Sequence, residues 1–195
     1  MEVRLSDYKE EWATMFREEA ECLTSVFDGV EIRFEHFGST AVPGMKAKPV
    51  IDMMGIVDDI NRLDLFNDRM ASLGYDIAGD WGISGRRLFR KGGEQRTHHI
   101  HFYQSDSPQI ERHLIFRDYL LSHPEEVARY SRFKEQLAQR YERTNEYSPA
   151  KKAFVSEMEQ LAPSPGTHKQ TNNLLFVLLG APDIITVHVL HYICP

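Results

Sequence analysis

The sequence predicts a mixed α/β (α+β) domain in which a β-sheet of about five strands is backed by helices, with a helical C-terminal third. Segments that alternate apolar and polar residues with period two are interleaved with long segments in which apolar residues recur at helical spacing. Three later segments each open with proline, which is favoured at the first helical position. At 195 residues, the chain has room for one well-cored domain and an appendage.

The first element is an amphipathic helix over residues 7–27, with Asp7 as its N-cap and Asp28-Gly29 at its end. Residues 31–37 then alternate with period two and predict a strand. One face of this strand carries Ile32, Phe34 and His36. After a turn or short helix, residues 49–57 predict a buried strand that Asp52 interrupts.

A second long helix is predicted over residues 59–73, because its apolar residues have helical spacing and Gly74 is a good stop signal. Three further strands follow, at 75–78, 88–90 and 98–103. The last three helices are expected to cover a face of the sheet, and they open at Ser107-Pro108, His123-Pro124 and Ser148-Pro149.

Composition excludes several classes of protein. The net charge of −6 argues against a dedicated duplex-DNA binder, which needs a strongly basic face. The longest apolar run, 174–179, is too short to span a bilayer, so no membrane partner is expected. Cys22 and Cys194 lie at opposite ends without a paired spacing, which favours neither a disulfide framework nor a cysteine zinc site. We expect a soluble cytoplasmic protein.

The domain is expected to occupy residues 1–162, and residues 163–195 form an atypical apolar tail. The only formally charged side chains of the tail are Lys169 and Asp183. Its two apolar runs, 174–179 and 184–190, are compatible with a hairpin added to a sheet edge. A poorly ordered or non-native extension explains them equally well.

The most informative segment runs from His36 to Asp52. A strand that ends in Gly38-Ser39 lets the backbone approach an anion, and Ser39 adds a hydroxyl donor. Asp52, on the next strand, is suited to holding a divalent ion against the same phosphates. The other candidate ligand-binding residues of this segment are His36, Thr40, Lys46 and Lys48. The alternatives are a turn with a capping serine, and a structural ion pair of Asp52 with Arg33, Lys48 or a neighbouring histidine.

This segment closely resembles the GrpB family, and the resemblance covers roughly residues 3–162. The string Gly38-Ser-Thr-Ala-Val-Pro-Gly with Lys48-Pro-x-Ile-Asp52 carries it. Outside the segment, the matching positions are Tyr8, Trp12, 116–125, Tyr130, Lys134, Tyr147, Lys151 and Phe154. The resemblance implies a bacterial protein with a nucleotidyltransferase-like fold, with Gly38-Ser39 as the phosphate-binding turn and Asp52 at the first metal position.

The sequence departs from active nucleotidyltransferases at one position. Those enzymes carry Asp-x-Asp on this strand so that two metal ions can bridge the reacting oxygens, and here the second position is Met54. His99 and His101 share one face of the strand at 98–103 and are candidate substitutes. If this strand neighbours Asp52, and if His36 at the Gly-Ser turn also approaches, a two-histidine, one-carboxylate metal site becomes possible, in particular through Asp52 and His101. The alternatives are acid/base chemistry and local hydrogen bonding.

A local excess of basic residues lies between Arg86 and Tyr103 and suggests an anionic ligand, although a solvated loop explains it as well. The candidate ligand-binding residues there are Arg86, Arg87 and Arg90, with Arg96 nearby. Arg117 and Asp118 are expected to form an internal ion pair. Tyr147 and Lys151 lie one helical turn apart and could reach a phosphate or ribose, or could be exposed helix surface.

Together these features predict a protein that binds a nucleotide or another phosphorylated small molecule with Mg²⁺ and without an organic cofactor. Asp52, His99 and His101 are the candidate catalytic residues of a metal-dependent nucleotidyltransferase. The alternative is a non-catalytic phosphate-ligand-binding or protein-interaction module, in which Met54 reflects lost chemistry.

Overall fold

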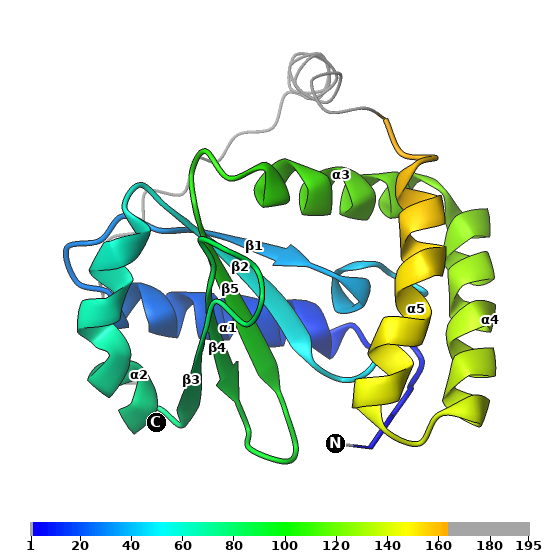
Figure 1. Ribbon diagram of the computed structural model, residues 1–195, viewed down its shortest axis with the longest axis horizontal. Helices are drawn as coiled ribbons and strands as arrows, with labels where there is room; N and C mark the ends of the chain where they lie inside the picture. Colours follow the sequence, from blue (N-terminus) through cyan, green and yellow to red (C-terminus); the bar gives the residue numbers. More distant parts are fainter. Residues whose placement is uncertain (1, 164–195) are drawn as a thin grey trace. The chain divides into compact units, whose positions relative to one another are not determined.

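Five strands form one mixed β-sheet in the computed structural model, which describes residues 2–163 (Figure 1). The strands are β1 (Arg33–Phe37), β2 (Ile51–Val57), β3 (Tyr75–Gly79), β4 (Arg87–Lys91) and β5 (His98–Gln104). Their order in the sheet is β1-β2-β5-β4-β3. The central pair, β2 and β5, is parallel, and the other pairs are antiparallel. The predicted fold class is therefore confirmed.

A row of directly paired residues crosses the whole sheet, and we call it the Asp52 row. It consists of Phe37, Asp52, His99, Arg90 and Asp76. Because paired residues of neighbouring strands point to the same face, these five side chains start from one face of the sheet.

The opposite face carries the main hydrophobic core and is covered by α1 (Glu11–Val26), by the 3-10 helix η2 (Ile60–Phe66) and by α2 (Asn67–Ser72). The prediction that α1 begins at Asp7 is wrong: the helix begins at Glu11, and the Asp7 carboxylate pairs with Lys46 instead. The single helix predicted over 59–73 is also wrong. Its apolar residues Ile60, Leu63 and Phe66 are three apart, which is the period of a 3-10 helix.

Helix α3 (Pro108–Ser122) covers part of the face from which the Asp52 row starts, where Ile110 packs with Met54 and Tyr103. The other two helices, α4 (Pro124–Arg140) and α5 (Thr144–Glu159), do not cover the sheet as predicted. They pack against α3 and against Val42 and Met45 of the β1–β2 connection, beside one end of the sheet (Figure 1). A pocket remains between the helix pair and the beginning of β2.

Helix α5 begins at Thr144, four residues before the predicted Ser148. Pro149 lies inside it and removes one backbone hydrogen bond, which the burial of Tyr147 and Met158 offsets. The chain divides into two units, Met1–Ala162 and Pro163–Pro195. The expected hairpin over 174–190 and Cys194 lie outside the described residues. Within residues 2–163, no helix is both long and apolar enough to cross a membrane.

Candidate anion and metal site

The turn after β1 approaches Asp52 closely. Gly38 has φ +71°, and a Cβ atom at this position would lie 2.9 Å from Asp52 Oδ2, so glycine is required for both reasons. Ser39 then opens a 3-10 turn, η1 (Ser39–Ala41), which exposes the Ser39 side chain to the space in front of β2. The predicted approach of the Gly-Ser turn to Asp52 is thus present in the structure.

His36 supports this turn from the other face of the sheet. Its Nε2 lies 3.0 Å from Thr40 Oγ1, and its ring stacks on Phe16 of α1 with 4.9 Å between the ring centroids. Burial is the main cause that lowers the pKa of His36 to about 4, so the ring is neutral at pH 7. Because His36 starts from the face opposite to Asp52 and contacts Thr40, the expected approach of His36 to Asp52 is not seen, and its role is to position Thr40.

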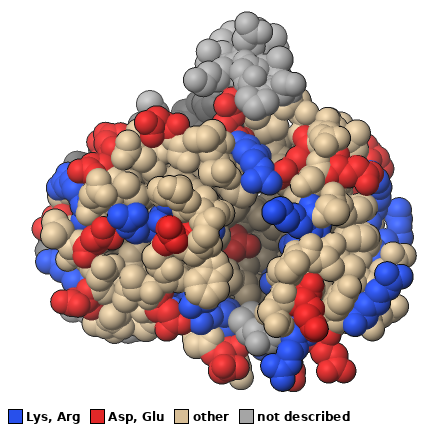
Figure 2. Space-filling model, in the orientation of Figure 1, with Lys and Arg blue, Asp and Glu red and all other residues tan. Residues whose placement is uncertain are grey.

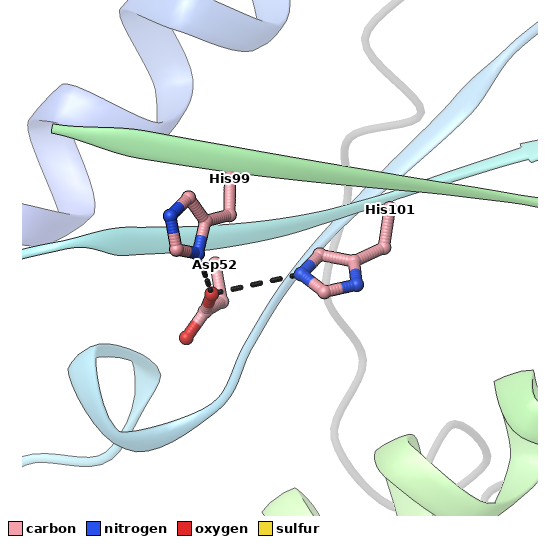
Figure 3. Close-up of side chains that lie close together, drawn as sticks. All are labelled: Asp52, His99 and His101. Carbon is pink, nitrogen blue, oxygen red and sulfur yellow. Dashed lines mark ion pairs between the residues drawn. The ribbon is translucent and has the colours of Figure 1, made fainter. Parts of the chain in front are cut away.

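Asp52, His99 and His101 form a cluster on neighbouring strands (Figure 3). Asp52 Oδ1 lies 3.4 Å from His99 Nδ1 and 3.7 Å from His101 Nε2. Burial alone would raise the pKa of Asp52, but His101 and His99 outweigh it and hold the pKa well below its usual range. The condition that β5 neighbours Asp52 is met. The partners of Asp52 are these two histidines rather than Arg33 or Lys48.

Arg86 determines which nitrogen of His101 carries hydrogen. Arg86 Nη1 lies 3.2 Å from His101 Nδ1, and because a guanidinium only donates, Nδ1 must accept. Burial lowers the pKa of His101, so the ring is neutral and its hydrogen is on Nε2, the atom that faces Asp52. A metal-bound histidine has the opposite arrangement, with the second nitrogen donating to an acceptor. His101 therefore fits a hydrogen-bond donor better than a metal ligand, and Asp52 is the residue suited to hold a cation.

A pocket of about 90 Å³ opens in front of Asp52, between the Gly38–Ser39 turn and helices α4 and α5. Figure 2 shows this face hollowed between the sheet and the helix pair, with basic side chains near the hollow. The residues that line it are Ser39, Thr40, Ala47, Lys48, Val50, Asp52, His99, Lys134, Tyr147 and Lys151. Of the predicted ligand residues, the structure thus brings together Ser39, Thr40, Lys48, Tyr147 and Lys151.

Three lysines dominate the electrostatics of this pocket. Lys134 is 2% exposed and its Nζ donates to Ser39 Oγ over 2.9 Å, while Lys48 and Lys151 are half-buried. Burial is the main cause that lowers the pKa of all three, and the neighbouring ammonium groups lower the pKa of Lys134 and Lys48 further. The carboxylate of Asp52 raises the pKa of Lys48 and Lys151 in part, whereas no carboxylate among the described residues does so for Lys134.

Lys134 was not among the ligand residues that the sequence predicted, although a signal for it exists. The apolar stripe of α4 follows Val127, Tyr130, Leu137 and Tyr141, and Lys134 occupies the stripe position between Tyr130 and Leu137. A lysine inside an apolar stripe is buried at a cost and indicates a function. Tyr147 is 1% exposed and faces the pocket, so the alternative that it is exposed helix surface is wrong.

The structure places other predicted ligand residues away from the pocket. Lys46 pairs with Asp7 and with Glu135, and Arg87 pairs with Asp64 over 2.8 Å. Arg86 is buried and supports His101 rather than lining the pocket.

Two further arginines have other partners. Arg90 belongs to the Asp52 row but stacks on Trp81, and Arg96 pairs with Asp76 over 2.5 Å. The expected ion pair of Arg117 and Asp118 is confirmed at 2.7 Å, and Arg117 also pairs with Glu35.

Comparisons with known proteins show which family this chain resembles. The family described as GrpB protein matches residues 2–161. UPF0157 protein YqkA of Bacillus subtilis is 44% identical over 156 residues, which are 80% of this chain and 46% of YqkA, so the chain spans about half the length of that relative. The crystal structure of conserved protein GrpB from Enterococcus faecalis matches 80% of this chain and 95% of that chain, with 40% identity and a TM-score of 0.77.

The structure of Cid1 in complex with its short product ApU matches 64% of this chain and 39% of that chain, with 13% identity and a TM-score of 0.39. This likeness is too weak to support an argument about activity. The match over residues 2–161 and the structural likeness to the Enterococcus protein lead to one conclusion: the chain belongs to the GrpB family.

Proposed function

We propose that this protein binds a phosphorylated small molecule, with the phosphate held in the pocket at the Gly38–Ser39 turn. The observation that carries the proposal is the set of three lysines, Lys48, Lys134 and Lys151, in a pocket whose lining includes a single carboxylate, Asp52. One carboxylate does not balance three ammonium groups in a partly closed pocket, and an anionic ligand would supply the missing negative charge. A phosphate group supplies the charge and several acceptor oxygens.

Asp52 would hold a Mg²⁺ ion beside this phosphate. Mg²⁺ keeps several waters and is usually bound through one or two carboxylates together with substrate phosphates, so a single aspartate is a sufficient protein ligand. When bound, the ion neutralises phosphate charge. Met54, which is fully buried, occupies the position of the second carboxylate and offers no oxygen to a second ion.

His99 is the residue best suited to move a proton. Its Nδ1 faces Asp52, which leaves Nε2 as an acceptor, the arrangement of an aspartate-oriented general base. In a nucleotidyl transfer, an acceptor hydroxyl would attack the α-phosphorus and pyrophosphate would leave, with His99 taking the hydroxyl proton. Met54 favours a second candidate, a non-catalytic module that binds the phosphorylated molecule without this step.

Thermal stability measured with inorganic phosphate, pyrophosphate, ribose 5-phosphate and ATP, each with and without Mg²⁺, tests the proposal. We expect stabilisation by at least the simple phosphates, and loss of the Mg²⁺-dependent part in Asp52→Asn. No stabilisation of the wild type by any of the four compounds would refute it. Metal-dependent turnover of a nucleoside triphosphate that Asp52→Asn abolishes favours the transferase. Binding without turnover favours the module.

A further inference from the structure

The loop between β3 and β4 presents one aromatic side chain to solvent. Trp81 is 62% exposed, and its φ of +43° is the only positive φ at a non-glycine residue within residues 2–163. A bulky residue in this conformation is a true outlier, and such strain persists only where the surroundings hold it. An exposed indole in a strained turn points to a function for the ring itself.

The surroundings do hold Trp81. The Arg86 guanidinium donates to the backbone carbonyl of Trp81 over 2.9 Å and to that of Asp80 over 3.1 Å. Asp80 also accepts from the Gly82 amide through its side chain. Arg86 is the same residue that contacts His101 beside Asp52, so one buried side chain fixes both the loop and the site.

One face of the Trp81 ring is already occupied. The Arg90 guanidinium carbon lies 4.4 Å from the ring centroid, a cation–π stack that pre-orients the indole. With 62% of the residue exposed, the other face of the ring is open to solvent. Ile77 is another exposed apolar residue, but it pairs with Phe89 of the core and starts from the opposite face of the sheet. Ile77 and Trp81 therefore do not form one apolar patch.

The position of this stack relative to Asp52 suggests a ligand. Arg90 belongs to the Asp52 row, one strand from His99 and two strands from Asp52. Neighbouring strands are about 4.8 Å apart, so the backbone of Arg90 lies roughly 10 Å across the sheet from that of Asp52. The sugar and the base of a mononucleotide together extend over a length of this order from the phosphate.

We infer that Trp81, oriented by Arg90, is a stacking platform for the base of a nucleotide whose phosphate lies in the lysine pocket. This inference rests on the proposed function and narrows its ligand class from phosphorylated molecules to nucleotides. Base stacking on an aromatic side chain is tolerant of base identity, because every base has a π-face. The platform therefore distinguishes nucleotides from sugar phosphates rather than one base from another.

The test compares the dissociation constants of AMP and ribose 5-phosphate, which share the phosphate and the sugar, in the presence of Mg²⁺. For the wild type, we expect AMP to bind about 5- to 150-fold more tightly, the range expected for one stacked base. Trp81→Ala should abolish this difference and leave ribose 5-phosphate binding unchanged, whereas Trp81→Phe should retain much of it. Leu65→Ala, which removes another exposed apolar side chain, is the matched control.

Three results would overturn the inference: equal binding of AMP and ribose 5-phosphate to the wild type, a parallel loss of both ligands in Trp81→Ala, or a changed oligomeric state of that variant. The first of these leaves the phosphate site intact. If neither phosphate compound binds, the proposed function fails, and a titration with adenosine then tests the stacking platform by itself. Quenching of Trp81 fluorescence by adenosine would support the platform, and no quenching would overturn it. Trp12 is 1% exposed and contributes a separable, buried signal.

Discussion

Replacing Lys134 with methionine should make the free protein more stable and the phosphate complex weaker. Lys134 is 2% exposed, its Nζ donates to Ser39 Oγ over 2.9 Å, and it lies 4.3 Å from the centroid of the Tyr130 ring. Burial and the charges of Lys151 and Lys48 hold its pKa well below the usual range. Methionine keeps most of the volume and removes the charge.

The size of the effect follows from these contacts. A buried ammonium without a counter-ion costs several kcal/mol, whereas the hydrogen bond and the ring contact contribute about 1 kcal/mol each. Lys134→Met should therefore raise the free energy of unfolding by about 1–2 kcal/mol, or the melting temperature by roughly 2–8 °C. Loss of one charged hydrogen bond to phosphate, about 1.5–3 kcal/mol, should weaken phosphate binding about 10- to 150-fold.

Calorimetric unfolding at several pH values, with and without inorganic phosphate, measures both effects. Because the folded state binds the Lys134 proton less tightly than the unfolded state, the wild type gains stability as the pH rises toward the usual lysine pKa. The difference in stability between Lys134→Met and the wild type should therefore shrink between pH 7 and pH 10. Lys152→Met, on the exposed side of α5, should change neither quantity. A Lys134→Met protein that is less stable than the wild type and binds phosphate equally well would refute the reasoning.

Three further perturbations follow from the same contacts. Gly38→Ala should destabilise the fold by about 1–3 kcal/mol in urea denaturation, because Gly38 has a φ of +71° and the added Cβ atom would lie 2.9 Å from Asp52 Oδ2. An unchanged denaturation midpoint would contradict this. Arg86→Gln should shift His101 away from the tautomer with hydrogen on Nε2, as read from imidazole ¹⁵N chemical shifts, and unchanged shifts would exclude the positioning role. Burial lowers the pKa of His113 to about 4, so the free energy of unfolding should fall by about 1–3 kcal/mol as the pH falls from 6.5 to 4. His113→Gln should reduce this fall in stability. An equal fall in both proteins would show that another group causes it.

The strands and their inward faces could be predicted from the sequence because period-two alternation is a local property. This alternation predicts that His99 and His101 share one face, and their pairing with Asp52 and Met54 of β2 confirms it. The helix ends were less predictable. Asp7 resembles an N-cap, but its carboxylate pairs with Lys46, a tertiary contact that no local pattern encodes.

The candidate site could be predicted only in part, because much of it depends on loops and on distant helices. The turn at Gly38 and the carboxylate of Asp52 lie within one segment, and the sequence predicts them as parts of one site. Charge alone predicts Arg86 to be a ligand residue, whereas its contacts to Trp81 and His101 depend on the β3–β4 loop. Lys134 gained its role only through the packing of α4 beside the sheet.

The hydrogen bond between Lys134 and Ser39 joins residues 95 positions apart, so the pocket cannot be completed until α4 has emerged during synthesis. The contacts of Asp52 with His99 and His101 need nothing beyond β5, whereas the lysine pocket also needs α4 and α5. A ligand that binds there stabilises only the state in which both helices are docked. Phosphate binding would then report completion of folding, and protection of α4 and α5 amides from hydrogen exchange should rise with ligand more than that of the strands.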